Sequence, residues 1–181
     1  ESKYPTHNIV SRMRVSADPD VADYNSEQVL IDVPQFDPGN AYHCGGQLAF
    51  GNDKNLYIAM GDNRNSASAQ NLSDLQGSIL RINVHVDPEP VAFGAPLYQI
   101  PPGNPFANNT SGYLPEIYAY GFRSPIRMTW DPVSGALIVN DIGLSSWEEV
   151  NIVTKGANYG WAEREGPEQV WEELGRGDLN G

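Results

Sequence analysis

The apolar residues of this chain stand in short runs bounded by turn residues, and this pattern restricts the fold more than any other feature of the sequence. The runs are about five residues long and recur at intervals of about 8–12 residues, which is typical of an all-β domain. We predict strands over residues 8–15, 28–33, 47–50, 56–60, 78–86, 116–120, 126–130, 137–140 and 150–153. Helical spacing is found only over residues 167–174, which start with a proline and are followed by Gly175 as a stop signal.

Two segments resemble each other weakly, and this bears on which all-β architecture the chain adopts. Residues 45–62 and 126–141 each contain an apolar strand, a turn with Asp and Gly, a second apolar strand, and then Gly-Asp or Asn-Asp. Recurrence of this kind is what the blades of a β-propeller produce. A β-sandwich has similar strand spacing, so the pattern by itself leaves both architectures open.

The first of these segments predicts a pair of side chains suited to proton transfer. A hairpin over residues 47–60, with its turn at residues 51–55, brings His43 and Asp62 to the same end of the sheet. A neutral histidine that donates one ring N–H to a carboxylate has a fixed tautomer and a more basic free nitrogen, as a general base requires. The alternative is a histidine that only satisfies a turn, because such pairs are common. The polar residues 63–74 that follow are predicted to form a surface loop.

Charge and composition narrow the possible partners. The 181 residues are enough for one domain, and their net charge of −12 opposes binding to nucleic acid or to anionic lipid. No apolar run approaches the roughly 18 residues that a membrane span needs. We therefore expect no nucleic acid partner and no membrane span, and a neutral or cationic ligand instead. The single cysteine, Cys44, excludes an internal disulfide and a CxxC metal site.

Seven motifs occur in order along the chain. They are Tyr-His-Cys-Gly-Gly-Gln-Leu-Ala-Phe-Gly (42–51), Leu-Tyr-Ile-Ala-Met-Gly-Asp (56–62), Ala-Gln-Asn-Leu (69–72), Gly-Ser-Ile-Leu-Arg-Ile (77–82), Ile-Pro-Pro-Gly-Asn-Pro-Phe (100–106), Pro-Glu-Ile-Tyr-Ala-Tyr-Gly-Phe-Arg-Ser-Pro (115–125) and Trp-Glu-Glu-Val-Asn-Ile-Val-Thr-Lys-Gly-Ala-Asn-Tyr-Gly-Trp (147–161). Together they closely resemble the soluble dehydrogenases of glucose and other aldose sugars that depend on pyrroloquinoline quinone (PQQ). The resemblance extends over residues 10–166.

This resemblance implies a fold and a function for the chain. The family folds as a six-bladed β-propeller, with cofactor and sugar bound over the central channel. The chain matches about half of the family domain, so residues 1–181 are expected to form a partial propeller of about three blades. Residues 162–181 are then a loop or short helix that leads into a missing blade. The implied reaction is the PQQ-dependent oxidation of an aldose to its lactone. It involves a sugar substrate, an external electron acceptor and the remaining blades, in the periplasm or outside the cell.

The resemblance also implies roles for individual residues. His43 matches the family's general base, which takes the proton of the sugar's anomeric hydroxyl while a hydride passes to the quinone, and Asp62 matches the acidic residue that orients this base. Arg123 matches an arginine that contacts the quinone's carbonyl oxygens, where a guanidinium stabilises the negative charge that arrives with the hydride. The alternative for Arg123 is a salt bridge at the rim. Ser124 stands at the next cofactor-binding position.

Two calcium sites are implied in the same way. Gly143 and Leu144 fall where the family uses backbone carbonyls to hold the cofactor's Ca2+, so loop shape is expected to matter there more than residue identity. Glu149 and Tyr159 match a second, structural calcium site, through a carboxylate and a backbone carbonyl. Glu148 is a further candidate ligand. Oxygen ligands of these kinds suit calcium. The alternative is that Glu148 and Glu149 are solvated charges on a strand.

Other positions bear on whether the chain is an enzyme. Ser124 replaces the asparagine that usually follows the cofactor arginine, and Ile142 replaces a polar residue before the calcium-binding glycine. The first blade and the later blades, which carry further cofactor ligands in the family, have no counterpart. The alternative function is therefore a non-catalytic propeller that binds a protein or glycan partner, and a third interpretation is a structural module of a larger assembly. Trp147 and Trp161 are predicted to pack between blades.

Overall fold

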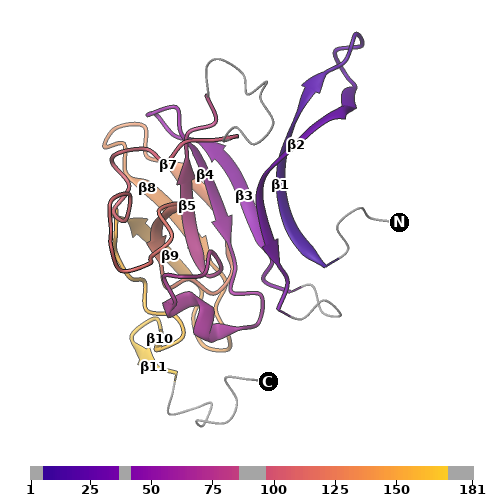
Figure 1. Cartoon of the computed structure of the whole chain (residues 1–181). Helices are drawn as coiled ribbons and strands as arrows, with labels where there is room; N and C mark the ends of the chain where they lie inside the picture. Colours follow the sequence, from indigo (N-terminus) through magenta and orange to yellow (C-terminus); the bar gives the residue numbers. More distant parts are fainter. Residues whose placement is uncertain (1–5, 37–41, 86–96, 171–181) are drawn as a thin grey trace.

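Every sheet in the computed structural model, which describes residues 6–36, 42–85 and 97–170, is antiparallel (Figure 1). A two-stranded ribbon comes first, formed by β1 (His7–Val15) and β2 (Ala22–Pro34). The next sheet contains, in spatial order, β3 (Gly45–Phe50), β4 (Leu56–Met60), β5 (Ser78–Ile82) and β6 (Ile117–Tyr120). A three-stranded sheet follows, formed by β7 (Pro125–Trp130), β8 (Leu137–Asp141) and β9 (Glu149–Val153). A short 3-10 helix, η1 (Ser66–Gln70), and a small hairpin of β10 (Arg164–Glu165) and β11 (Glu168–Gln169) complete the described elements.

The sheet β3–β6 lies between two hydrophobic cores and is buried on both faces. On strand β4, Leu56, Ile58 and Met60 face the core shared with β1 and β2, whereas Tyr57 and Ala59 face the core shared with β7–β9. Burial on both faces explains why this strand is an uninterrupted apolar run in the sequence. A sandwich has two layers, whereas here one sheet is covered on each side by another. The packing is therefore that of successive propeller blades.

The two larger sheets approach each other most closely where β3 lies against β7. Gly46 on β3 makes this possible, since a Cβ added there would lie 2.1 Å from the carbonyl oxygen of Pro125 on β7. One residue further on, the side-chain oxygen of Gln47 accepts the backbone N–H of Met128 at 3.0 Å. A small residue and a hydrogen bond thus fix the distance between these two strands.

The strands predicted from the apolar runs are confirmed, but some of their ends differ; β2 begins at Ala22, six residues before the predicted start. The predicted strand over residues 78–86 ends at Ile82, after which Asn83 pairs only with Gln99 in an isolated bridge; Val86 lies outside the described residues. None of the helical segments in the described ranges has the length and apolarity that a membrane crossing requires.

Two predictions of local structure are wrong. Residues 167–170 are not helical, because Gly166 takes a φ of 57° and allows a two-residue turn between β10 and β11; residues 171–174 lie outside the described part of the chain. The prediction of a surface loop over residues 63–74 is wrong for part of the segment, since Asn63, Ser68 and Ala69 are almost fully buried. Ala67, Asn71 and Ser73 are exposed as expected. Short polar side chains suggested solvent exposure, but inside the protein they hydrogen-bond to neighbouring loops.

The close approach at Gly46 leads to a test of the packing between sheets. Gly46→Ala is expected to destabilise the protein by about 1–3 kcal/mol, because the added methyl group must push β3 away from β7. The matched control is Gly45→Ala, where an added Cβ meets no atom within 4 Å. Denaturant titration of both variants provides the measurement. Equal unfolding free energies for the two variants would contradict the packing described here.

Candidate active site

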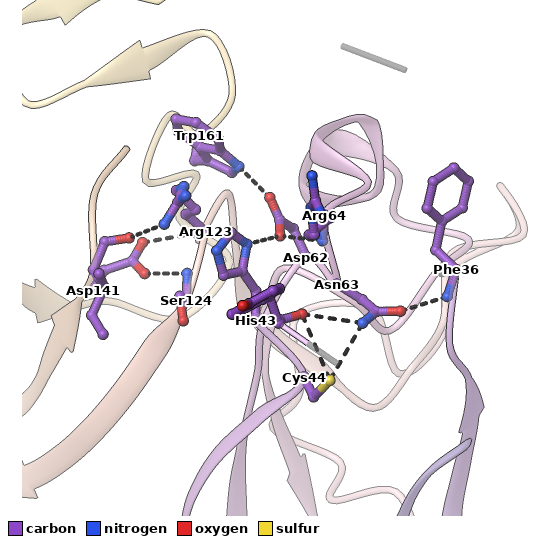
Figure 2. Close-up of polar contacts among 12 residues, drawn as sticks. Phe36, His43, Cys44, Asp62, Asn63, Arg64, Arg123, Ser124, Asp141 and Trp161 are labelled. Atoms are coloured by element: carbon purple, nitrogen blue, oxygen red, sulfur yellow. Dashed lines mark hydrogen bonds and ion pairs between the residues drawn. The ribbon is translucent and has the colours of Figure 1, made fainter. Parts of the chain in front are cut away.

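Polar residues gather at one end of the two larger sheets (Figure 2), among them the predicted His43, Asp62 and Arg123. His43 precedes β3 and Arg123 precedes β7, while Asp62 follows β4 and Asp141 ends β8. In an antiparallel sheet, one strand begins at the end of the sheet where its neighbour stops. Because β3 and β7 also pack together, the residues at this end of one sheet lie next to those at the same end of the other.

Asp62 is the buried centre of this cluster. Its Oδ1 atom lies 2.8 Å from Nδ1 of His43 and accepts the backbone N–H of Arg64 at 2.9 Å. Its Oδ2 atom accepts the indole N–H of Trp161 at 2.7 Å. Only 1% of the surface of Asp62 remains in contact with water. The three donors therefore compensate for the lost hydration of its carboxylate. The pairing expected from the hairpin is present, and the catalytic role of His43 stays a prediction.

A second histidine–aspartate pair shows what distinguishes this one. On the β1–β2 ribbon, Nδ1 of His7 contacts Oδ1 of Asp32, but 35% of the histidine side chain and 47% of the aspartate side chain are exposed. The corresponding values are 19% for His43 and 2% for Asp62. Among the described residues, Nε2 of His43 has no hydrogen-bonding partner, so this nitrogen is available to a ligand.

Asn63 holds the backbone around His43. Both residues adopt a left-handed conformation, with φ of 50° each, which is uncommon outside glycine and tolerated best by asparagine. The backbone N–H of Asn63 donates to the carbonyl of His43 at 3.0 Å, and its side-chain amide donates to the carbonyl of Tyr42 at 3.2 Å and to Sγ of Cys44 at 3.4 Å. Sequence reasoning missed Asn63, although Asn directly after the Gly-Asp end of a strand is a signal for such a turn.

Arg123 is a half-buried cation beside this pair. Its guanidinium donates to the carbonyl of Ile142 at 3.2 Å and lies 5.4 Å from the centre of the Trp161 ring. Burial lowers the pKa of Arg123. Nearby carboxylates oppose this shift, and Asp62 and Asp141 contribute most to the opposing effect. Within the described part of the chain, the guanidinium forms no ion pair, so the alternative of a rim salt bridge is not supported.

Asp141 positions the turn that carries Arg123. Its carboxylate accepts the backbone N–H groups of Arg123 at 2.9 Å and of Ser124 at 2.6 Å. Burial raises the pKa of Asp141 to about 7, although these two hydrogen bonds favour the charged form and oppose the shift. Sequence reasoning did not select Asp141, but its place after an apolar strand, equivalent to that of Asp62, was the available signal. Ser124 contacts Asp141 and Ile142 through its backbone.

Trp161 links the base to the arginine. It is 6% exposed, so the prediction of a packing role holds, but its indole N–H also binds Asp62 and its ring lies beside Arg123. A buried tryptophan needs a partner for its N–H, and here the partner is the carboxylate that orients His43. Periodicity cannot reveal such a contact, because Trp161 and Asp62 are 99 residues apart.

The loop after β8 is held by two glutamates. Glu148 accepts the backbone N–H of Gly143 at 3.2 Å, and one carboxylate oxygen of Glu165 accepts the consecutive backbone N–H groups of residues 144–147. Burial by itself would raise the pKa of Glu165, but the backbone hydrogen bonds lower it overall. A Cβ at position 143 would lie 1.7 Å from the carbonyl oxygen of Trp147. The shape of the loop therefore requires glycine at position 143, because the loop closes onto its Cα.

Glu149 and Tyr159, predicted to share a calcium ion, have different neighbours. The carboxylate of Glu149 accepts the backbone N–H of Gly166 at 2.6 Å and the side-chain amide of Asn151 at 3.1 Å. The Tyr159 hydroxyl donates to the carbonyl of Ile152 at 2.8 Å. Over the described ranges, no three His, Cys, Asp or Glu residues form a group that could hold a metal ion. A calcium site built on Glu149 and Tyr159 stays a prediction.

The sequence matches the Glucose / Sorbosone dehydrogenase family over residues 1–173, and the chain belongs to this family. It is 38% identical over 133 residues to the aldose sugar dehydrogenase YliI of Escherichia coli K12, a match that covers 74% of the chain and 32% of YliI. It is 41% identical over 133 residues to the HIPL2 protein of Arabidopsis thaliana, covering 68% of the chain and 19% of that protein. The human Hedgehog-interacting protein is 35% identical over 117 residues, covering 62% of the chain and 15% of that protein.

Solved structures give the same result. A glucose dehydrogenase superposes with a TM-score of 0.70 at 32% sequence identity, covering 85% of the chain and 40% of that protein. The PQQ-bound form of the aldose sugar dehydrogenase from Streptomyces coelicolor superposes with a TM-score of 0.63 at 27% identity, covering 91% of the chain and 47% of that protein. The predicted family and the predicted all-β propeller fold are confirmed. The chain spans about a third of the length of YliI and less than half of either of these structures.

The contact between Trp161 and Asp62 leads to a stability test. Trp161→Phe keeps an aromatic ring beside Arg123 but removes the N–H donor, which leaves one oxygen of a buried carboxylate without its partner. We expect a loss of about 1–3 kcal/mol in unfolding free energy. The control is Trp147→Phe, because Trp147 is 44% exposed, its indole N–H binds no other described residue, and phenylalanine keeps a ring against Gly166. The effect of this control should stay within about 0.5 kcal/mol. A loss in Trp161→Phe no larger than that of the control would show that the hydrogen bond contributes nothing.

Proposed function

We propose that this chain supplies the general base and one cofactor-binding cation of a PQQ-dependent dehydrogenase that oxidises aldose sugars to lactones. The observation that carries the proposal is the His43–Asp62 pair beside the guanidinium of Arg123, which forms no ion pair with any described residue. Trp161 contacts both Asp62 and Arg123. Membership of the glucose and sorbosone dehydrogenase family and the likeness to a PQQ-bound aldose sugar dehydrogenase support it.

His43 acts as the base in this proposal. Its Nδ1 atom faces the Asp62 carboxylate, which fixes the tautomer with the lone pair on Nε2. Nε2 takes the proton of the sugar's anomeric hydroxyl as the C1 hydride leaves and the C1 carbonyl forms. Asp62 then stabilises the imidazolium, and it can do so because the backbone N–H of Arg64 and the indole N–H of Trp161 hold the carboxylate in place.

Arg123 fits an anionic, planar cofactor. Its guanidinium is half-buried and, among the described residues, has no carboxylate partner, so a carbonyl or carboxylate oxygen of PQQ can accept its hydrogen bonds. When bound, PQQ supplies a quinone that accepts the hydride. Arg123 stabilises the negative charge that results, and Asp141 keeps the turn at Arg123 and Ser124 in place.

Calcium is the second proposed cofactor. The backbone carbonyls of Gly143 and Leu144 are oxygen donors of the type that Ca2+ binds, and the N–H groups of the same loop are already taken by Glu148 and Glu165. A further calcium ion is proposed at Glu149 and the carbonyl of Tyr159, with Glu148 as an additional candidate. Oxygen–calcium distances of about 2.3–2.6 Å are expected at both sites.

The active protein is proposed to contain more than these residues. The remaining blades complete the propeller and the cofactor site, and an external acceptor removes the electrons. We place the protein in the periplasm or outside the cell, as the family resemblance implies.

A second candidate function is a propeller that binds a protein or glycan without catalysis. The similarity to the human Hedgehog-interacting protein favours it, as do Ser124 and Ile142 in place of polar residues of the enzyme pattern. The two candidates differ in whether PQQ binds and is reduced.

Quinone reduction at saturating sugar tests the enzymatic proposal, in a protein that carries this chain together with the remaining blades. His43→Ala is expected to lower the rate by roughly 10²–10⁴-fold with PQQ binding nearly unchanged, because only the base is lost. His7→Ala is the matched control, since His7 also pairs with an aspartate but stands on the β1–β2 ribbon.

Arg123→Ala is expected to weaken PQQ binding as well as turnover. Arg127→Ala, which removes an exposed arginine from β7, is its control and should change neither. Absence of PQQ binding by the unaltered protein in the presence of Ca2+ would reject the enzymatic proposal in favour of the binding propeller. Full activity in His43→Ala would reject the assignment of the base.

A further inference from the structure

One carboxylate oxygen of Glu165 collects four consecutive backbone N–H groups. Oε1 accepts from Leu144 at 2.5 Å, from Ser145 at 2.9 Å, from Ser146 at 3.2 Å and from Trp147 at 3.3 Å. Successive N–H groups that converge on an anion form a nest, a known mode of anion binding by backbone. Here the anion is a side chain of the same protein, and the residue is only 4% exposed.

The nest determines where the loop's carbonyl groups point. In a planar trans peptide, the carbonyl of one residue is directed opposite to the N–H of the next. The N–H groups of Leu144 and Ser145 face Glu165, so the carbonyls of Gly143 and Leu144 face away from it. Residues 143–148 line a hollow of about 170 Å³, and Glu165 is not among its lining residues.

The position of Glu165 is set by a hairpin that packs against the loop. It ends β10, in the tight hairpin with β11, where Glu165 is paired with Glu168. The hairpin turn is held against the loop, because the N–H of Gly166 donates to Glu149 and a Cβ at Gly166 would lie 2.8 Å from the Trp147 ring. The carboxylate is thus supplied by a paired strand whose turn contacts the loop at Trp147 and the adjacent Glu149.

We propose that Glu165 is a positioning residue that orients the carbonyls of Gly143 and Leu144 for a divalent cation. The proposal rests on the calcium site of the proposed function and adds a residue that acts on that site without touching the ion. A carboxylate suits this task better than a neutral acceptor, because charge-assisted hydrogen bonds are shorter and stronger. Without it, four N–H groups lose their partner and the peptide planes of the loop are free to rotate.

Calorimetric titration with Ca2+ alone tests this, in a protein that carries the chain with its remaining blades. Glu165→Ala is expected to lower the calcium affinity by roughly 10–100-fold, the usual cost of removing a residue that orients metal ligands. Glu165→Gln keeps an acceptor oxygen without the charge, so its affinity should lie between those of Glu165→Ala and the unaltered protein. Glu168→Gln, on the exposed partner position of the same hairpin, should leave the affinity within about twofold.

Thermal unfolding without calcium separates positioning from a purely structural role. We expect Glu165→Gln to bind calcium more weakly than the unaltered protein, even where Glu165→Gln and Glu168→Gln have the same melting temperature without calcium. Unchanged affinity in Glu165→Gln overturns the proposal while leaving the calcium site of the proposed function intact, and this holds even where Glu165→Ala does not fold. An unaltered protein that binds no calcium overturns both.

Discussion

The buried carboxylate of Asp62 is the interaction on which the candidate site depends. Its side chain contacts His43, the backbone of Arg64 and the indole of Trp161, while its own backbone N–H donates to the carbonyl of Arg123 at 2.8 Å. Three other parts of the chain, around His43, Arg123 and Trp161, therefore meet the turn that contains Asp62. A charge removed from water is tolerated only when all its partners are present, so the contacts of Asp62 hold one another in place.

The same chemistry recurs in the loops around Asp62. Asp141 accepts two backbone N–H groups, Glu165 accepts four, and Glu148 and Glu149 accept one each. Some of the chain's acidic side chains thus fix loop backbones. The sequence suggested that the negative charge restricts the possible partners. Several of the carboxylates also hold loop backbones in place, which the composition could not indicate.

These carboxylates leave Arg123 in an unusual position. The guanidinium lies near several acidic groups, but those groups bind backbone or neutral donors. The guanidinium itself donates a hydrogen bond to the carbonyl of Ile142. A half-buried cation whose neighbours are otherwise engaged is suited to bind an anionic ligand. The chemistry proposed for the site follows from this division of partners: carboxylates hold the loops, and the arginine remains for the ligand.

The sequence by itself determined the strands, the all-β class and the His43–Asp62 pair. These depend on short apolar runs bounded by turn residues and on one hairpin, and both are local properties of the chain. The tertiary structure decided what local patterns cannot contain. The contact of Trp161 with Asp62 joins residues 99 apart, and the nest around Glu165 joins a loop to a hairpin about 20 residues later. The segment at residues 167–170 had helical spacing but became a hairpin strand, because the positive φ of Gly166 and the packing against Trp147 outweighed a weak periodic preference.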